Sequence, residues 1–422
     1  MHLDYREKKS KIAGFEISCK INVNNCIKFG LCCLQQNIIL SGQEISVSSA
    51  KGETMSLKVG MLTSGGDCQG LNSAMRGVAK RLYENDKNTE IIGFLDGYAG
   101  LMHRNFKHLS SSDFSGILTL GGTILGTSRQ SFKTMNDPLF PNQKDGPSKL
   151  DAMLRTYKEL DLDALVILGG NGTHKTANLL YENGLNILTL PKTIDNDLWG
   201  TDMTFGFQSA INIATEVIDG IHSTATSHGR VFIVEIMGHK VGWMTLHAGI
   251  AGGADVILLP EIPYDPMAIA AAINRRAKEH KRFSIIAIAE GAKSKEEAKL
   301  SKAEYLQKLE SSQYISVAYR LAAMLDKLTV QEVRCVVPGH FQRGGTPSAF
   351  DRVLTTSLGV EAADMILDKK FGKMVGIVNN QIVGIPLKQV AGKLKSVPLD
   401  HYLIADARKT GIYFGDEQLV DG

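Results

Sequence analysis

From Leu57 onward, the chain alternates short apolar runs with glycine-rich turns and amphipathic stretches. Most of the runs are rich in β-branched residues and apolar on both faces, which is typical of buried parallel strands. The predicted strands are Val59–Thr63, Ile91–Leu95, Ala164–Leu168, Ile187–Leu190, Val231–Ile236, Val256–Leu259, Ile285–Ala289 and Cys335–Val337. Their alternation with helical segments predicts an α/β fold with a mostly parallel sheet.

Two segments predict helices. After Gly70, apolar residues recur at spacings of three and four, at positions 71, 74, 75, 78, 79 and 82. The segment Glu296–Met324 predicts a further helix with charged residues on its outer face. Residues 133–150 are rich in Asn, Asp, Pro and Lys and predict a surface loop.

The first 54 residues do not share this pattern. Their apolar stretch, 26–40, is interrupted by a lysine and three amides, and falls short of the roughly 18 apolar residues that a membrane helix needs. A signal peptide is not expected either, because no small-residue cleavage pattern follows that stretch. Met55 resembles a start methionine that leads directly into a strand. We expect residues 1–54 to be a loosely ordered extension or a stretch outside the mature protein, with a packed N-terminal element as the alternative.

Composition narrows the class of protein. The 422 residues are 43% apolar and 22% charged, which is ordinary for a globular protein of two to four compact units. The net charge of +3 argues against a dedicated nucleic-acid binder. Four of the six cysteines precede residue 55, and their spacing lacks the C-x2-C pair of a typical metal site. The scarcity of cysteine in the rest of the chain favours a reducing, cytoplasmic location.

Two glycine-rich segments directly follow predicted strands, Thr63–Gly70 and Leu168–Thr173. Glycine lets the backbone approach a phosphate closely, and the start of a helix offers free N–H groups. Neither segment is a Walker motif, because no Gly-Lys-Ser/Thr follows. Each alone is also compatible with a tight turn that binds nothing. Their repetition at the carboxyl ends of strands favours a phosphate-handling enzyme.

The segment Pro191–Asp197 places two carboxylates just after a predicted strand. Either Asp195 or Asp197 is a candidate to deprotonate a hydroxyl while the other holds Mg²⁺ or tunes the pKa of its neighbour. Thr193 and Lys192 are candidates to contact a moving phosphoryl group. In isolation, such a pair of aspartates is more typical of a turn with side-chain hydrogen bonds.

Basic side chains, arginines and one histidine, form the last candidate group. Arg334, His340 and Arg343 surround the final predicted strand and its glycine turn. Because guanidinium groups clamp phosphate with a planar fork, this segment predicts an anchor for a phosphorylated substrate, with surface ion pairs as the alternative. Arg129 is a further candidate cation.

The order and the amino-acid sequences of these segments resemble those of the phosphofructokinase family over about residues 57–354. Pro-Lys-Thr-Ile-Asp-Asn-Asp at 191–197 and Gly-His-Phe-Gln-Arg-Gly-Gly at 339–345 carry the resemblance. It implies a catalytic unit over 55–422 with two Rossmann-like lobes and the active site in the cleft between them. The larger, donor-binding lobe would span about 57–206 plus part of 344–422, and the smaller, sugar-phosphate lobe about 207–343.

The resemblance also implies an activity and roles for single residues. The γ-phosphoryl group of ATP would pass to the 1-hydroxyl of fructose 6-phosphate, with Mg²⁺ as cofactor. Asp195 would be the base, Asp197 a second carboxylate that supports base and metal, and Thr193 and Arg129 contacts of the transferred group. The implied donor contacts are Gly65, Arg129, Gly170, Asn171, Gly172 and Thr173. The implied sugar-phosphate contacts are Thr193, Met237, Gly238, His239, Glu290, Arg334, His340 and Arg343. Arg230 would reach the sugar phosphate of a neighbouring subunit, which implies a homo-oligomer, dimer or tetramer, with a shared active site.

The chain departs from the family pattern at two positions. Asn171 stands where a metal-binding aspartate is usual, so Mg²⁺ would depend on Asp197, water and the donor phosphates. His239 stands where an arginine is common, so one cation is either missing or supplied by the protonated imidazole.

The donor rests on two further residues. Gly172 leaves room for the α-phosphate of ATP, whereas Lys192 resembles the pyrophosphate-using members, a combination like that of the mixed-substrate branch. We expect ATP, because open, uncharged space is a physical requirement of the larger donor.

Other functions stay open. The first alternative is a pyrophosphate-dependent fructose 6-phosphate 1-phosphotransferase. A related lipid or nicotinamide-nucleotide kinase shares the glycine loop but lacks the pairing of the 191–197 and 339–345 motifs. A sugar-phosphate sensor without activity would fit Asn171 and His239, but the intact Asp195 and Arg129 disfavour it. Nucleic-acid and membrane partners are not expected.

Overall fold

The computed structural model describes residues 5–12, 15–22, 38–40, 43–45, 56–143 and 145–416. The chain divides into two compact units, Met1–Met55 and Ser56–Gly422. The first unit contains two antiparallel strand pairs that the sequence pattern did not predict: β1 (Tyr5–Ile12) with β2 (Phe15–Asn22), and β3 (Ile38–Leu40) with β4 (Gln43–Ile45). Most of the apolar stretch 26–40, with three of the early cysteines, lies outside the described residues, so the expectations for it stay predictions.

The larger sheet of the second unit has seven strands in the order β15-β14-β9-β8-β5-β6-β7. Its strands are β5 (Lys58–Ser64), β6 (Glu90–Phe94), β7 (Phe106–Leu109), β8 (Ala164–Gly169), β9 (Ile187–Pro191), β14 (Lys373–Val378) and β15 (Gln381–Pro386). The five inner strands are parallel, and the two edge strands are antiparallel to their neighbours. Every residue of β8 is buried, which explains its unbroken apolar run.

The smaller sheet has four parallel strands in the order β11-β12-β10-β13. They are β10 (Val231–Ile236), β11 (Val256–Leu258), β12 (Ser284–Ala289) and β13 (Val333–Val336). The expected α/β fold with mostly parallel sheets is therefore confirmed.

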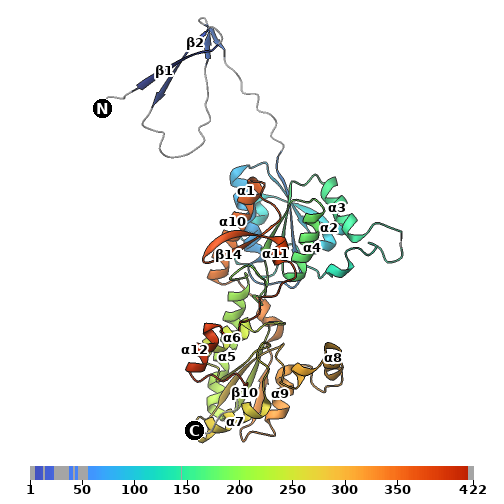
Figure 1. The fold of residues 1–422 in the computed structure, drawn as a ribbon, viewed down its shortest axis with the longest axis vertical. Coiled ribbons are helices and arrows are strands. Elements are labelled where there is room, and N and C mark those ends of the chain that lie inside the picture. The colour runs from blue at the N-terminus through green and yellow to red at the C-terminus, as the bar shows by residue number, and fades with distance from the viewer. Residues whose placement is uncertain are drawn as a thin grey trace. The chain divides into compact units, whose positions relative to one another are not determined.

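Twelve α-helices within the described residues surround these sheets. They are α1 (Leu71–Asn85), α2 (Tyr98–His103), α3 (Lys149–Glu159), α4 (Asn171–Glu182), α5 (Phe207–His228), α6 (Trp243–Ala251), α7 (Pro266–Lys278), α8 (Lys302–Glu310), α9 (Val317–Leu325), α10 (Ala349–Leu367), α11 (Leu387–Val390) and α12 (Tyr402–Lys409). In Figure 1, α1, α4 and α10 flank the larger sheet, which contains β14, and α6, α7 and α9 flank the smaller sheet, which contains β10. None of the helices in the described part of the chain has the length and apolar character needed to cross a membrane.

One apolar core joins the two sheets. It includes Leu190 beside the larger sheet, Phe207 at the start of α5, and Val234 within the smaller sheet, all of them buried. Two further clusters fill the remaining face of each sheet. Because the first cluster is continuous, burial of apolar surface holds the two lobes together.

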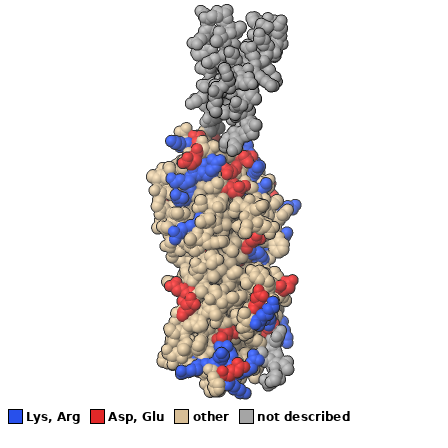
Figure 2. All heavy atoms as spheres, turned by 90° about the vertical axis from the view of Figure 1, so that its left-hand side faces the viewer, with Lys and Arg blue, Asp and Glu red and all other residues tan. Residues whose placement is uncertain are grey.

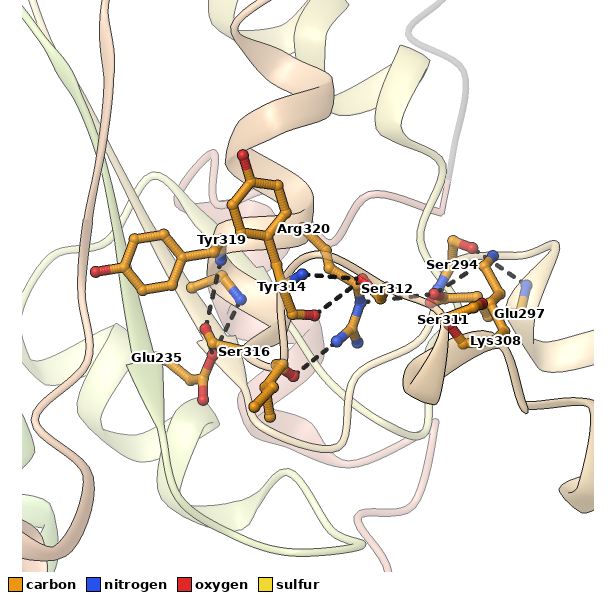
Figure 3. A network of polar contacts seen from close by, with 12 residues as sticks. Glu235, Ser294, Glu297, Lys308, Ser311, Ser312, Tyr314, Ser316, Tyr319 and Arg320 are labelled. Carbon is orange, nitrogen blue, oxygen red and sulfur yellow. Dashed lines mark hydrogen bonds and ion pairs between the residues drawn. The ribbon is translucent and has the colours of Figure 1, made fainter. Parts of the chain in front are cut away.

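The single helix predicted over Glu296–Met324 is wrong, because serines interrupt it. Ser301 accepts a hydrogen bond from the Glu304 N–H and starts α8, and Ser316 does the same for Tyr319 at the start of α9. Between the two helices, the Tyr314 N–H donates to Ser312 Oγ at 3.2 Å (Figure 3). Serine hydroxyls offer the backbone partners outside a helix and therefore favour caps and turns. The loop predicted over 133–150 likewise ends early, at Ser148, which caps α3.

Helices α1 and α10 pack backbone against backbone. A Cβ atom on Gly359 would lie 2.6 Å from the carbonyl oxygen of Ala74, and one on Gly77 would lie 2.9 Å from that of Thr356. Both distances are shorter than a van der Waals contact, so only glycine permits this approach. The contact fixes α1, and with it the glycine-rich loop that precedes it, against the C-terminal part of the chain.

We predict that Gly359→Ala destabilises the protein by about 1–3 kcal/mol, because the two helices must move apart. Chemical denaturation followed by circular dichroism measures this. Gly220→Ala is the matched control: it also lies in a helix, α5, but its added methyl group meets open space. That variant should be unchanged or gain about 0.5–1 kcal/mol. Equal stability of the two variants would contradict the close packing.

Candidate active site

A cavity of about 680 Å³ lies where the carboxyl ends of strands from both sheets come together. Residues that follow β5, β8 and β9 line it from the larger sheet, and residues that follow β10 and β12 line it from the smaller one. Ligands of open α/β sheets bind at this end of the strands. The cavity is therefore the candidate active site.

Most of the residues singled out from the sequence line this cavity. They are Gly65, Arg129, Gly170, Asn171, Gly172, Thr173, Lys192, Thr193, Asp195, Asp197, Met237, His239, Glu290 and Arg343. Gly238 lies beside them, since its N–H donates to Glu290 Oε1 at 3.3 Å.

Three of the residues singled out from the sequence, Arg230, Arg334 and His340, lie away from the cavity. Arg230 immediately precedes β10, Arg334 lies near the start of β13, and both pair with the carboxylate of Glu332. Because the strands are parallel, this cluster lies at the amino ends, opposite the edge that bears the cavity. His340 is exposed in the 3₁₀ turn η6 (Gly339–Arg343) and does not line the cavity. The roles expected of these three residues stay predictions.

On the side of the cavity where a phosphoryl donor is expected, the wall is formed largely by the backbone of the two glycine-rich turns. Helix α4 begins at Asn171, directly after β8, so its first N–H groups lack partners within the helix. A Cβ atom on Gly172 would meet nothing within 4 Å, so open space lies above this turn. The Gly65 N–H donates to the Ser128 carbonyl at 3.0 Å, which holds Arg129 beside the first glycine loop.

Three cations converge on that first loop. A Cβ atom on Gly66 would lie 3.2 Å from Nη1 of Arg343 and 3.5 Å from Nη2 of Arg129. Lys192 Nζ donates to the carbonyl oxygen of Gly66. Burial lowers the pKa of Lys192, while the nearby Cys68 and the carboxylates of Asp195 and Asp67 oppose the shift. On the face shown in Figure 2, Lys and Arg side chains are interspersed with Asp and Glu.

The two aspartates occupy a tight turn after β9. Asn196, between them, has a φ of 53°, a left-handed conformation that is uncommon outside glycine. Burial first, and then the charge of Asp197, raise the pKa of Asp195 to about 6, although Arg343 and Lys192 oppose the shift. Burial also raises the pKa of Asp197. Asp195 Oδ1 is buried and has no hydrogen-bond partner within the described part of the chain, so it is available to a ligand.

The same side chains fit a magnesium ion that is bound together with phosphates. Among the described residues, no group of three or more His, Cys, Asp or Glu side chains is arranged to hold a metal ion by itself. Two buried side-chain oxygens at the cavity, Asn171 Oδ1 and Asp195 Oδ1, nevertheless lack partners there, and Asp197 adds a carboxylate. Mg²⁺ prefers oxygen ligands and is commonly held by one or two carboxylates and the phosphates of the substrate.

The opposite wall is organised by Glu290. Its Oε1 atom accepts from the His239 N–H at 2.7 Å and thereby fixes the turn after β10, where the φ of His239 is 52°. The Met237 N–H donates to Gln342 Oε1 at 3.2 Å. Gln69 donates from Nε2 to the carbonyl oxygens of Gln342 and Gly344, and so joins the first glycine loop to η6.

Sequence reasoning missed several lining residues. These are Gln130, Lys175, Lys240, Gly392 and Leu394. Lys175 stands on α4 one turn after Asn171, a spacing that was readable once the helix start was known. The residues after 391 carry no motif, and only the fold brings them to the cavity, where Asn171 Nδ2 donates to the Lys393 carbonyl at 2.7 Å.

Known proteins resemble this chain along most of its length. An ATP-dependent 6-phosphofructokinase of Spirochaeta thermophila is 51% identical over 358 residues, which cover 85% of this chain and 97% of that protein. An ATP-dependent 6-phosphofructokinase of Propionibacterium freudenreichii is 47% identical over 380 residues, covering 86% and 100%. The solved phosphofructokinase of Saccharomyces cerevisiae superposes with a TM-score of 0.65 at 29% identity, covering 79% of this chain but 45% of the yeast chain.

The sequence model of the family Phosphofructokinase matches residues 58–366, which are more than half of the chain. These residues contain β5, β8, β9, β10 and β12, the five strands whose ends and following loops form both walls of the cavity, and η6. By sequence and fold together, the chain belongs to the phosphofructokinase family.

Proposed function

We propose that the protein is an ATP-dependent 6-phosphofructokinase of glycolysis, which converts fructose 6-phosphate into fructose 1,6-bisphosphate. The observation that carries the proposal is Asp195, a half-buried residue whose buried Oδ1 atom has no hydrogen-bond partner among the described residues, in a cavity where three cations meet. The names of the sequence relatives support the same activity. The scarcity of cysteine after residue 54 supports a cytoplasmic enzyme.

Asp195 acts as the general base. Its carboxylate takes the proton of the sugar 1-hydroxyl as that oxygen bonds to the γ-phosphorus and the bond to the β-phosphate oxygen breaks. A base is most effective when its pKa lies near the working pH, and burial brings Asp195 toward that range. The charge of Asp197 contributes to the raised pKa of Asp195, and its carboxylate lines the cavity, where it can support a metal ion.

The remaining side chains position the phosphates and neutralise charge. Phosphoryl transfer passes through a loose transition state, so catalysis depends mainly on positioning and electrostatics. Arg129 lines the cavity beside the first glycine loop, and Lys192 and Arg343 border the same loop. Asn171 and Asp197 would hold Mg²⁺, which when bound neutralises the donor phosphates.

ATP is favoured as donor by the open space at Gly172. Pyrophosphate is the second candidate, and Lys192 is the observation that favours it, because its ammonium lies beside the donor loop. A lysine is compatible with both donors, whereas only an open site admits ATP.

Arg230 and Arg334 are proposed to serve another copy of the chain. Both lie at the edge of the small sheet away from their own cavity, and they share one carboxylate, Glu332, between two guanidinium groups. A surplus of positive charge at that edge suits a sugar phosphate bound by a neighbouring subunit. The enzyme would then be a homo-oligomer with active sites shared between subunits.

The first prediction concerns the base. Asp195→Ser should lower kcat by about 10²–10⁴-fold, because the hydroxyl loses its proton acceptor. Binding of fructose 6-phosphate, measured by isothermal titration calorimetry, should persist. Asp219→Asn, at an exposed carboxylate of α5, is the control and should keep the wild-type rate. Unchanged turnover of Asp195→Ser would show that another group is the base.

A second prediction separates the donors. Gly172→Asp should lower kcat/KM for ATP by about 10²-fold or more while sparing pyrophosphate, because an aspartate repels the α-phosphate. No clash is expected, since the position faces open space. Gly172→Asn fills the same volume without charge and should cost ATP turnover much less. If both variants lose ATP activity equally, size rather than charge controls the donor.

The third prediction is a pH profile. Because the pKa of Asp195 is raised to about 6 and the base must be ionised, kcat/KM should fall about tenfold per pH unit below that value and level off above it. His239 also faces the cavity, so the profile is repeated with His239→Gln. The acid limb should stay in place in that variant. Its disappearance would assign the limb to the imidazole instead.

A further inference from the structure

Residues 392–397 run between the two lobes beside the cavity, which Gly392 and Leu394 help to line. The Lys393 carbonyl accepts from Asn171 of the donor loop, and the Lys395 N–H donates to the Asp197 carbonyl at 2.8 Å. On the other side, Trp243 Nε1 donates to the Lys395 carbonyl at 2.9 Å, and the Val397 N–H donates to Glu261 Oε1 at 2.9 Å. One short segment thus touches the donor loop, the aspartate turn and the small lobe.

The ammonium of Lys395 is directed at the aspartate turn. It donates to Asn196 Oδ1 at 2.9 Å, to the Thr201 carbonyl at 2.8 Å and to the Asp202 carbonyl at 2.9 Å. Lysine carries three donors, so these three acceptors use its full capacity. No neutral side chain of similar length could satisfy all three.

The residue that Lys395 holds is the one that separates the two aspartates. Asn196 keeps its left-handed conformation, and its Oδ1 atom also accepts from the Thr204 N–H at 3.0 Å. A non-glycine residue in this region persists only where its surroundings fix it. The peptide units on either side of Asn196 carry Asp195 and Asp197, so any relaxation there would reorient both carboxylates.

We propose that Lys395 is a positioning residue for phosphoryl transfer, which holds the Asp195–Asp197 turn in its reactive conformation and couples it to the small lobe through Trp243. The proposal rests on the proposed function, with Asp195 as base. Lys395 does not line the cavity, so it acts through the turn and not on the substrates. A displacement of about 1 Å in a reacting group costs about 10²-fold in rate, which sets the expected effect.

Lys395→Met tests this by hydrogen exchange and by kinetics. In the full-length protein, amides of residues 194–204 should exchange about tenfold faster, because the turn loses its ammonium partner. Strand β8 and helix α7 should be unaffected. In steady-state assays with fructose 6-phosphate and ATP, kcat should fall about 10²-fold with both KM values within about threefold of wild type. Lys388→Met removes an exposed lysine of α11 and is the control for both readouts.

Chemical rescue adds a readout that a purely structural role would not move. Lys395→Ala leaves space for a small amine, so propylammonium chloride should restore kcat in a saturable manner. Tetramethylammonium chloride at the same ionic strength has no N–H donor and should restore nothing.

The outcomes are distinct. Unchanged exchange over 194–204, or faster exchange spread through both lobes, overturns the role of Lys395 whether or not the protein is a kinase. Unchanged kcat, or a rise in KM alone, overturns it as well. If the wild-type protein transfers no phosphoryl group, the proposed function fails, and the exchange data alone then decide whether Lys395 holds the turn.

Discussion

The candidate active site depends on holding two neighbouring carboxylates, Asp195 and Asp197, half-buried at the cavity. Moving Asp195 and Asp197 out of water disfavours their charge, and their mutual repulsion adds to this cost. Arg343 and Lys192 offset part of it. The result is a carboxylate, Asp195, whose pKa is raised to about 6, which suits the base that we propose it to be. The elements around the cavity hold these carboxylates and cations close to one another.

That balance explains why so much of the chain converges on one turn. The larger sheet supplies the strand end, and α1, locked against α10 by Gly77 and Gly359, supplies the first glycine loop. The smaller sheet contributes Glu290, which fixes the facing turn through the His239 N–H. Residues 392–397 then bridge both lobes. Each contact is modest, but together they pre-organise the charges before substrates arrive, which is where enzymes gain most of their electrostatic advantage.

Much of this was readable from the sequence, for identifiable reasons. The inner strands are apolar on both faces, and the motif residues follow strand ends, so fold class and most of the cavity lining could be predicted. Strands β7, β14 and β15 were not predicted. β7 and β15 are edge strands with one neighbour each, and β14 follows the last motif and pairs mainly with β15. The helix over Glu296–Met324 failed because serine capping outweighed helical periodicity. Lys395 could not be found, because its role depends on contacts with residues nearly two hundred positions away.

The central claim is that ATP phosphorylates the 1-hydroxyl of fructose 6-phosphate at this site. Phosphorus-31 NMR of the purified protein with fructose 6-phosphate, ATP and Mg²⁺ tests it directly. We expect a new sugar 1-phosphate resonance that grows in step with ADP. Formation of that resonance with pyrophosphate but not with ATP, or ADP release without any new sugar phosphate, would contradict it.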